Sequence, residues 1–500
     1  MYRSLFEIAL LTLALAIPIQ VLNLKIAHHF KLLDIPTARR RHDRPIPVTG
    51  GVGVILSWFV GLACFAFLQP QWFATHSQSL WMMVMCTSVL VLLGLIDDLR
   101  GLSPLWKLLV ESVIATIVVL YQPEIHTICE AWSQTWNGSW GHSSGFFVWP
   151  LAILWIVGIT NTVNLIDGLD GLAGGTSALV LCALTFLCFL VRIQTEFAIV
   201  LAALLIPSIL GFLGYNWPPA KLFLGDNGSL PLGFLIATAS LMCRPHSTSW
   251  IMMASMILML GYPLLDTGLA TLRRYRNGQP LFKADRNHLH YRIQRLGLNP
   301  KQTTTLLLSL SIYLQFTGVF INFLSPVPAA CAVGVTLFSI MTLLSLIRSV
   351  EKDRVRRIFE KVIEKHSRNH TPGIPEPHTV IHLQLGPLLE VALREEQNRY
   401  QAIMDSLELL IRSVLRSEDR IFLSDQKLSV LLMRTLTSAE EKNRLIARIR
   451  DKIDAFLSLY EIQCSLASIP ITTEQLVFLA DRDPSEVLKK RGLKPSKKAS

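Results

Sequence analysis

Long apolar stretches separated by short polar connections fill the first two thirds of the chain. About eleven of these runs are long enough, or nearly long enough, to cross a bilayer, which takes about 20 residues of helix. Ten or twelve spans fit the same pattern. The periodicity therefore predicts an all-α polytopic membrane domain. The runs lie at Leu5–Leu24, Gly51–Leu68, Leu80–Ile96, Leu105–Tyr121, Phe146–Thr162, Leu172–Val191, Phe197–Tyr215, Leu230–Cys243, Trp250–Leu272, Thr304–Phe323 and Val327–Ile347.

The composition agrees with a membrane protein. Of the 500 residues, 51% are hydrophobic and only 17% are charged, which is too apolar for an ordinary soluble domain. No convincing small-residue cleavage site follows the first run, so we expect a retained span and not a removed signal peptide. The eight cysteines form no CxxC pair, which argues against a disulfide framework or a zinc site.

The positive charges indicate how the helices are oriented. In an eleven-span count the three most basic connections fall on one side, and the connection Gln122–Gly145 on the other side has neither Lys nor Arg. The positive-inside rule then predicts that the N-terminus is outside and the C-terminus is cytoplasmic. The net charge of +11 thus reflects topology, and no nucleic-acid partner is needed to explain it. The basic groups are Lys25, Lys31, Arg39, Arg40, Arg41 and Arg44; Arg273, Arg274, Arg276, Lys283, Arg286, Arg292 and Arg295; and Arg348, Lys352, Arg354, Arg356 and Arg357.

Every conspicuous polar motif falls on the basic side in the same count. Asp97 and Asp98 end the third run, and Asn164–Asp170 follows the fifth. KLFLGDNGS (Lys221–Ser229) follows the seventh run, and DRNHLHYR (Asp285–Arg292) follows the ninth. We therefore expect one shared site at the cytoplasmic surface.

The segment Asn161–Gly175, NTVNLIDGLDGLAGG, is the strongest of these motifs. Asn164, Asp167 and Asp170 recur every three residues, close to one face of a helical turn, and the glycines between them permit close backbone approach. A carboxylate at the centre of a membrane helix costs roughly 2.5–3.5 kcal/mol on insertion scales. We therefore favour a functional site over a polar connection with ordinary helix caps.

Two other motifs supply acidic groups. Asp97 and Asp98 place like charges side by side, which disfavours ionisation of both unless a cation such as Lys107 offsets them; a solvated helix end is the alternative. Asp226 precedes a new apolar run and so lies at the expected N-terminus of a helix. Such an N-terminus is a favourable site for binding phosphate. Carboxylate and amide oxygens beside phosphates are the usual environment of Mg²⁺.

The basic groups around these acids fit an anionic substrate. His288 and His290 lie two apart in a basic loop and either bond phosphate oxygens or are solvated. Two interpretations are equally favoured for the arginines Arg39–Arg41, Arg273 and Arg274: they contact such a substrate, or they anchor to lipid headgroups. The pattern predicts a pocket for a polyphosphorylated substrate and an acceptor in the lipid. No Walker loop is present, so an ATPase has no support.

Six motifs in order resemble the polyprenyl-phosphate N-acetylhexosamine-1-phosphate transferase family, in particular its bacterial undecaprenyl-phosphate GlcNAc-1-phosphate branch. The resemblance covers about Leu5 to Ile347. It is carried by LLDIPTARRRHDRPIPVTGGVG, LGLIDDL with Lys107, NTVNLIDGLDGLAGG, KLFLGDNGS, YPLLDT and DRNHLHYRIQRLGL.

This resemblance implies transfer of a sugar 1-phosphate from a UDP-N-acetylhexosamine to undecaprenyl phosphate at the bacterial inner membrane. UMP would be released, and the product would start a cell-envelope glycan. Mg²⁺ is the implied cofactor, with Mn²⁺ as an alternative ion. The motifs imply a catalytic pair Asp97 and Asp98, metal ligands Asp226 and Asn164, and substrate-binding residues Asp167, Asp170, Lys107, Arg41, His42, His288 and His290. The family usually has HxHH, and here the third histidine is Tyr291.

The implied reaction exchanges one phosphoanhydride for another, so it needs no ATP. Direct attack by the lipid phosphate is favoured over a covalent aspartyl intermediate, because phosphoryl transfer chiefly needs positioning and charge stabilisation. A transporter that binds an ion or lipid head with the same carboxylates is the alternative. The acidic groups gather at one surface, however, and not near the midplane where transporters bind. A scaffold with a degenerate pocket is a further alternative, against which the retained aspartates argue.

The sequence after Arg348 is charged and mixed. It predicts a basic helix (Val350–His366), a linker (Thr371–Pro377) and a cytoplasmic α+β domain, giving divisions at 1–348, 349–377 and 378–500. The domain resembles the GGDEF type over about His378–Gly492, but LSDQK (Leu423–Lys427) lacks the glycines and acids of the signature turn. The resemblance implies a non-catalytic module that binds a cytoplasmic partner or regulator; a plain α+β domain is the alternative. The expected elements are a strand at Thr379–Leu385, helices at Leu388–Leu415 and Ser438–Ser458, and a hairpin within Asp419–Thr435.

Overall fold

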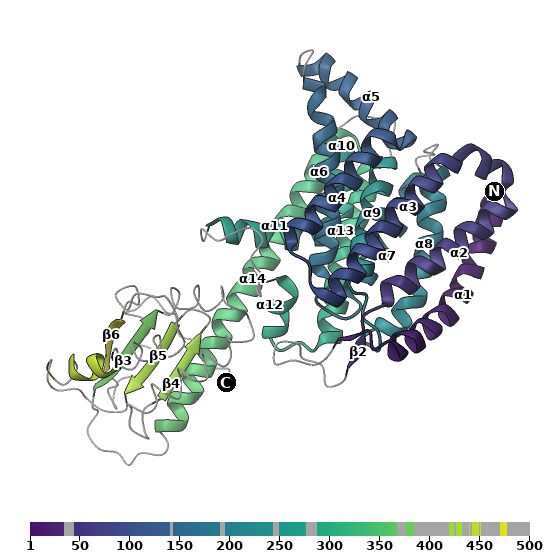
Figure 1. Ribbon diagram of the computed structural model, residues 1–500. Coiled ribbons are helices and arrows are strands. Elements are labelled where there is room, and N and C mark those ends of the chain that lie inside the picture. Colours follow the sequence, from purple (N-terminus) through teal and green to yellow (C-terminus); the bar gives the residue numbers. More distant parts are fainter. Residues whose placement is uncertain are drawn as a thin grey trace, which may run out of the picture. The chain divides into compact units, whose positions relative to one another are not determined.

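Helices make up nearly all of the first 367 residues in the computed structural model (Figure 1). The described residues up to Ile358 belong to one compact unit, and those from Phe359 onward belong to a second. The structure describes residues 1–34, 45–140, 144–190, 196–243, 250–276, 288–367, 377–384, 420–424, 427–432, 440, 443–449, 451 and 471–477.

The predicted apolar runs lie on helices of the first unit, although α3 begins at Pro70, before the predicted Leu80, and α14 continues past the predicted Ile347. Within the described residues, nine helices are long and apolar enough to cross a membrane, or ten if the bent pair α10–α11 is one span. The protein is therefore a multi-pass membrane protein. The helices are α1 (Tyr2–His29), α2 (Gly50–Leu68), α3 (Pro70–Arg100), α4 (Pro104–Tyr121), α5 (Pro123–Trp140), α6 (Val148–Ile166), α7 (Leu172–Leu190), α8 (Glu196–Asn216), α9 (Asp226–Met242), α10 (Trp250–Met259), α11 (Gly261–Arg276), α12 (Leu289–Arg295), α13 (Pro300–Phe320) and α14 (Pro326–Ser367), with 3₁₀ turns η1 (Ser144–Phe147) and η2 (Ile321–Phe323).

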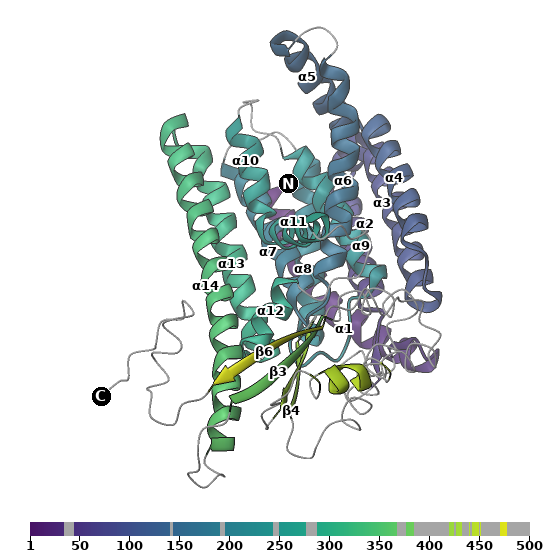
Figure 2. The same ribbon diagram turned by 90° about the vertical axis from the view of Figure 1, so that its left-hand side faces the viewer.

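The predicted ninth run is not one straight helix. Helices α10 and α11 meet at 85°, and Figure 2 shows α11 nearly end-on beside the upright α10. Pro263 explains the break, because a proline ring lacks the N–H for a helical bond and clashes with the carbonyl four residues earlier, here that of Met259. Gly261 permits the close packing at the bend, since a Cβ there would lie 2.7 Å from the Leu314 side chain.

The connection predicted between the fourth and fifth runs contains a helix. Helix α5 covers Pro123–Trp140, with Pro123 at its first turn, where the missing N–H costs no helical hydrogen bond. Ile125, Ile128 and Cys129 are buried on its inner side. The polar residues of this segment concealed the apolar face in the sequence.

Helix α9 lies inside the first unit. It contacts α2, α3, α6 and α7, and all its residues from Asn227 to Met242 are buried. Small residues make this possible: a Cβ at Gly94 of α3 would lie 2.3 Å from the Asn227 backbone nitrogen. The N-terminus of α9 is thereby held against the end of α3, which carries Asp97 and Asp98. A short ladder of β1 (Leu33–Asp34) and β2 (Ile46–Pro47) lies in the same unit.

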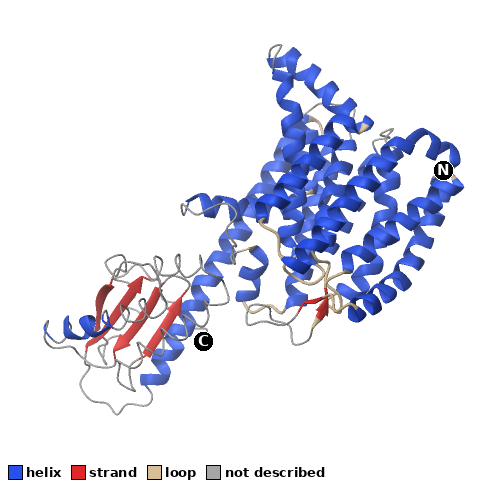
Figure 3. Cartoon of the chain, in the orientation of Figure 1, coloured by secondary structure: helices blue, strands red, loops and turns tan. Residues whose placement is uncertain are grey.

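The second unit contains a four-stranded antiparallel sheet, whose strands are the larger group of red arrows in Figure 3. The strand order is β4–β5–β3–β6. Strand β3 (Pro377–Gln384) lies where a strand was predicted, and β4 (Arg420–Ser424) pairs with β5 (Lys427–Leu432) as the predicted hairpin. Strand β6 (Ile471–Val477) was not predicted. The linker before Pro377, the helix at Leu388–Leu415 and Asp425 of the would-be signature turn lie outside the described residues. The likeness to GGDEF domains stays a prediction.

Candidate active site

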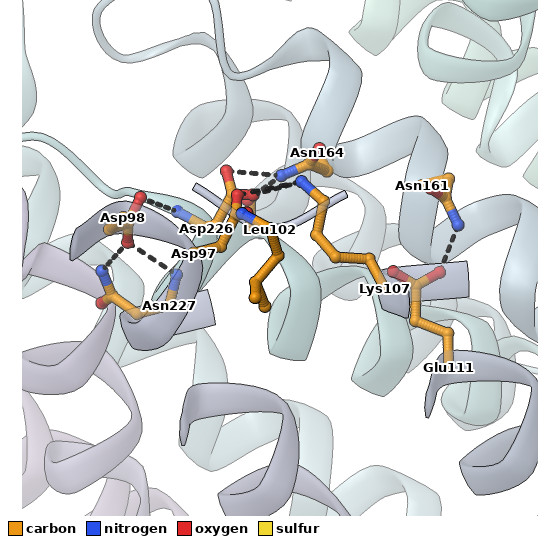
Figure 4. Close-up of polar contacts among 10 residues, drawn as sticks. Asp97, Asp98, Leu102, Lys107, Glu111, Asn161, Asn164, Asp226 and Asn227 are labelled. Carbon is orange, nitrogen blue, oxygen red and sulfur yellow. Dashed lines mark hydrogen bonds and ion pairs between the residues drawn. The ribbon is translucent and has the colours of Figure 1, made fainter. Parts of the chain in front are cut away.

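A half-buried lysine joins two of the predicted acidic motifs (Figure 4). Lys107, in the first turn of α4, donates from Nζ to Asp97 Oδ2 at 3.0 Å and to Asp226 Oδ2 at 2.9 Å. The Leu102 amide donates to the other oxygen of Asp97 at 2.5 Å. The ends of α3 and α4 and the start of α9 thus meet at one charged centre. Lys107 balances one of its two carboxylates, which leaves the centre net negative.

Asp98 has a different environment from its neighbour Asp97. Its two oxygens accept hydrogen bonds from the Asp226 and Asn227 amides, both at 3.1 Å, and from Asn227 Nδ2 at 2.6 Å. These amides are the first donors of α9, so Asp98 stabilises that helix N-terminus electrostatically. Gly225, with φ +73°, makes the turn before them in a conformation that favours glycine.

Two asparagines of α6 complete this side of the centre. Asn164 donates from Nδ2 to Asp226 Oδ1 and to Ser229 Oγ, both at 2.9 Å. One turn earlier, Asn161 donates to the carboxylate of Glu111 on α4 (Figure 4). Glu111 is 3% exposed and lies one helical turn after Lys107. The cross-links fix the end of α6 against α4 and α9.

The remaining aspartates of the NTVNLIDGLDGLAGG motif differ in their roles. Burial, followed by the charges of Asp226 and Asp98, raises the pKa of Asp167 well above its usual range. The carboxylates of Asp226 and Asp98 are thus near enough to act on Asp167, which adjoins the acidic centre. Asp170 instead accepts a hydrogen bond from the Ala220 amide at 2.9 Å, and its own carbonyl accepts one from Thr304 Oγ1. The contacts of Asp170 hold the loop before α9 in place.

The histidine segment is bound to a second carboxylate, that of the buried Asp266. Asp266 of α11 accepts from His288 Nδ1 at 3.0 Å and from the Leu289 amide at 2.7 Å. The ring of His290 stacks beside that of His288, with centroids 5.8 Å apart. Burial lowers the pKa of His290 to about 4, so this imidazole is neutral near pH 7. Tyr291, at the third histidine position of the motif, packs on His290 with ring centroids 4.1 Å apart.

A cavity of about 940 Å³ adjoins both groups. Its polar end is lined by Lys107, Asn161, Asn164, Arg274, His288, His290 and Tyr291. The rest of its wall is almost entirely apolar, from α6 residues such as Leu154 to Met252, Met253 and Met256 of α10. Leu154 and Met253 in this apolar wall are 65% and 55% exposed, so this part of the wall is accessible from outside the helices.

The acidic centre has the chemistry of a Mg²⁺ environment. No group of three or more His, Cys, Asp or Glu side chains within the described ranges is arranged to hold a metal ion by itself. Mg²⁺, however, is usually held by one or two carboxylates together with substrate phosphates and water. Asp226 and Asn164 supply oxygen atoms of that hard type beside Asp97, and the donor set therefore fits the ion.

Most of the predicted site residues come together in the structure. Asp97, Asp98, Lys107, Asn164 and Asp226 meet at the acidic centre. Asp167 adjoins it, and His288 and His290 line the neighbouring cavity. Asp170 lies at the neighbouring turn. Arg41 and His42 lie outside the described residues.

Three residues near these groups were not singled out from the sequence: Glu111, Asn161 and Asp266. An acidic residue within an apolar run was the available signal for Glu111 and Asp266. Asp266 stands within YPLLDT, and Asn161 opens the central motif, but neither motif alone shows which partner its polar residue has.

The comparisons with known proteins agree with one another. The glycosyl transferase family 4 model matches residues 80–244. A Bacillus subtilis (strain 168) protein named "Probable undecaprenyl-phosphate N-acetylglucosaminyl 1-phosphate transferase" is 30% identical over 317 residues, which cover 63% of this chain and 84% of that protein. The undecaprenyl-phosphate alpha-N-acetylglucosaminyl 1-phosphate transferase of Salmonella typhi is 29% identical over 61% of this chain and 80% of its own. The decaprenyl-phosphate N-acetylglucosaminephosphotransferase of Mycolicibacterium smegmatis is 28% identical over 65% and 84%.

Proposed function

The chain belongs to the family of polyprenyl-phosphate N-acetylhexosamine-1-phosphate transferases, glycosyl transferase family 4, and on this premise we propose its reaction. It transfers N-acetylhexosamine 1-phosphate from a UDP-sugar to undecaprenyl phosphate and releases UMP. The lipid-diphosphate-linked sugar starts a cell-envelope glycan. The three relatives described above have names that specify N-acetylglucosamine, so UDP-N-acetylglucosamine is the first donor to test.

One observation carries this proposal: an apolar cavity ends beside a charged centre. The lining changes from leucine and methionine to Lys107, Arg274 and the two histidines at one end. A polyprenyl phosphate has the same division, with an apolar chain and an anionic head. The isoprenoid chain could enter from the bilayer past the exposed side chains of Leu154 and Met253. The methionines suit an irregular isoprenoid, because their unbranched side chains adapt to its shape.

The charged centre supplies what the reaction needs. An oxygen of the lipid phosphate attacks the β-phosphorus of the UDP-sugar, the bond from that phosphorus to the bridging oxygen breaks, and UMP leaves with the electron pair. Lys107 would offset the phosphate charge at the end of the cavity. Mg²⁺, which Asp226 and Asn164 would hold, supplies charge neutralisation for the diphosphate when bound.

In this proposal the two adjacent aspartates, Asp97 and Asp98, have different roles. Asp98 is occupied by the three donors of Asp226 and Asn227, so it positions α9 and thereby the Asp226 carboxylate. Asp97 contacts Lys107 at the end of the cavity and is the candidate to receive a proton from the lipid phosphate. The site would face the cytoplasm in the inner membrane, where UDP-sugars are made available.

Narrowing the cavity tests the assignment of the lipid. Gly158 of α6 lines the cavity, and a Cβ added there meets no atom of the described residues within 4 Å. Gly158→Leu should therefore fold and fill space that the isoprenoid would use. We expect the KM for undecaprenyl phosphate to rise about tenfold, equivalent to about 1.4 kcal/mol of lost binding. The KM for the UDP-sugar should stay unchanged.

A matched control exists in α8. Gly214 is also helical, and a Cβ added there meets nothing within 4 Å in the part of the chain that the structure describes. It does not line the cavity, so Gly214→Leu should leave both KM values unchanged. UMP release by purified protein is the readout. Equal lipid KM values for the two variants would show that the cavity does not hold the lipid chain.

A further inference from the structure

The carboxylate of Asp266 is fully buried and accepts two hydrogen bonds from the segment that carries the histidines, His288–His290. It is 0% exposed and lies on α11 just after the 85° bend. One oxygen accepts from the His288 ring, and the other accepts from the Leu289 backbone amide. A buried carboxylate is costly unless it is paired and hydrogen-bonded. The Asp266 carboxylate therefore joins α11 to the start of α12.

The hydrogen bond to Asp266 makes the two ring nitrogens of His288 different. A carboxylate oxygen accepts but does not donate, so the proton of this bond lies on Nδ1 of His288. The other nitrogen, Nε2, is then the one left to meet a ligand in the cavity that His288 lines. A histidine held in this way has both its tautomer and its ring plane set by the second partner.

His290 does not share this arrangement. Its Nδ1 lies 4.0 Å from Asp266 Oδ2, beyond hydrogen-bond distance. Among the residues that the structure describes, neither of its ring nitrogens has a hydrogen-bond partner, although His290 is only 1% exposed and lines the cavity. The neighbouring histidines of the motif are therefore not equivalent, and Asp266 is what distinguishes them.

We infer that Asp266 is a positioning residue of the transferase. It holds the proton on His288 Nδ1 and fixes the ring, so that Nε2 faces the phosphate groups at the polar end of the cavity. Asp266 itself touches no substrate and acts through His288. This inference rests on the proposed function and adds to it a residue that controls the state of the histidine.

A double-mutant cycle tests whether Asp266 acts through His288. The readout is UMP release per molecule of inserted protein for Asp266→Asn, His288→Ala and the double variant. We expect Asp266→Asn alone to lose about 10–100-fold in kcat/KM, the usual loss when a supporting partner is removed. In the His288→Ala background the same change should cost less than about threefold, because the residue through which Asp266 acts is gone.

Glu111→Gln provides the matched control for loss of a buried carboxylate. Glu111 is 3% exposed and accepts from Asn161 of α6, so its effect should be the same in both backgrounds. An equal factor for Asp266→Asn in the two backgrounds would overturn the inference. Absence of UMP release by the unmodified protein with any UDP-sugar would remove the proposed function itself, which is a separate outcome.

A second variant covers the case in which Asp266→Asn lowers membrane insertion. His288→Asn places an amide nitrogen where Nδ1 was, and it therefore keeps the bond to Asp266 while Nε2 is lost. If Asp266 serves only to anchor α12, His288→Asn should have wild-type activity, and the inference fails. We expect His288→Asn to be as inactive as His288→Ala, with unchanged insertion.

Discussion

Replacing Lys107 by glutamine is the perturbation whose size follows most directly from the geometry. Its ammonium lies 3.0 Å from Asp97 and 2.9 Å from Asp226, and the three side chains are 20%, 14% and 23% exposed. At an effective dielectric constant of about 20, each contact is worth about 5–6 kcal/mol of Coulomb attraction before desolvation is subtracted. Removing one partner of a fully buried pair usually costs about 3–5 kcal/mol, and the loss here should be smaller because all three side chains are partly exposed.

The expected consequence for Lys107→Gln is a fall in kcat of about 10²–10³, as when one preorganised stabilising group is removed from an active site. Lys107→Arg should recover part of the loss, because the charge is kept but the guanidinium cannot occupy the same small space. UMP release, normalised to the amount of inserted protein, measures both variants.

The matched control is Lys301→Gln, which removes an exposed lysine from the first turn of α13. It should leave the rate unchanged. A Lys107→Gln enzyme that inserts normally and turns over within about threefold of wild type would refute the role of Lys107 at the charged centre.

The remaining predictions concern the other carboxylates and the second unit. Asp226→Asn should abolish transfer without preventing insertion, because its carboxylate is the one shared by Lys107 and Asn164; wild-type-like turnover would remove it from the metal site. Asp98→Ala should also lower the thermal unfolding temperature, since losing a helix cap costs about 0.5–2 kcal/mol; an unchanged temperature would contradict its role at α9. Ending the chain near His370 should retain UMP release per inserted molecule, because the motif residues all precede Arg348; a dead but inserted truncation would make the second unit part of the catalytic machinery.

The sequence was sufficient to locate the helices and most of the acidic centre, for a physical reason. Apolar runs must match the bilayer thickness, so the ends of α3, α6 and α8 could be placed within a few residues. Polar groups that end such runs on one side of the membrane share a thin layer. The sequence therefore predicted that Asp97, Asn164 and Asp226 lie close together, and the structure shows the contacts that join them.

What the sequence did not reveal depends on directions in space. The break between α10 and α11 needed both Pro263 and the packing of Gly261 against Leu314, and only the first is visible in the sequence. Asp266 reaches His288 across 22 residues, a pairing that no local spacing encodes. Likewise, the separate environments of Asp97 and Asp98 arise because successive helical residues point in directions about 100° apart.

Exchange of labelled UMP into a UDP-sugar, with and without undecaprenyl phosphate, is the most direct test of the proposed reaction. Because one phosphoanhydride replaces another, the step should be close to reversible, and direct attack lets UMP re-enter only through the lipid product. We predict that purified protein with Mg²⁺ incorporates the label into at least one UDP-N-acetylhexosamine only when undecaprenyl phosphate is present. Incorporation without the lipid would contradict direct attack. No incorporation with any UDP-N-acetylhexosamine in the presence of the lipid would contradict the transferase itself.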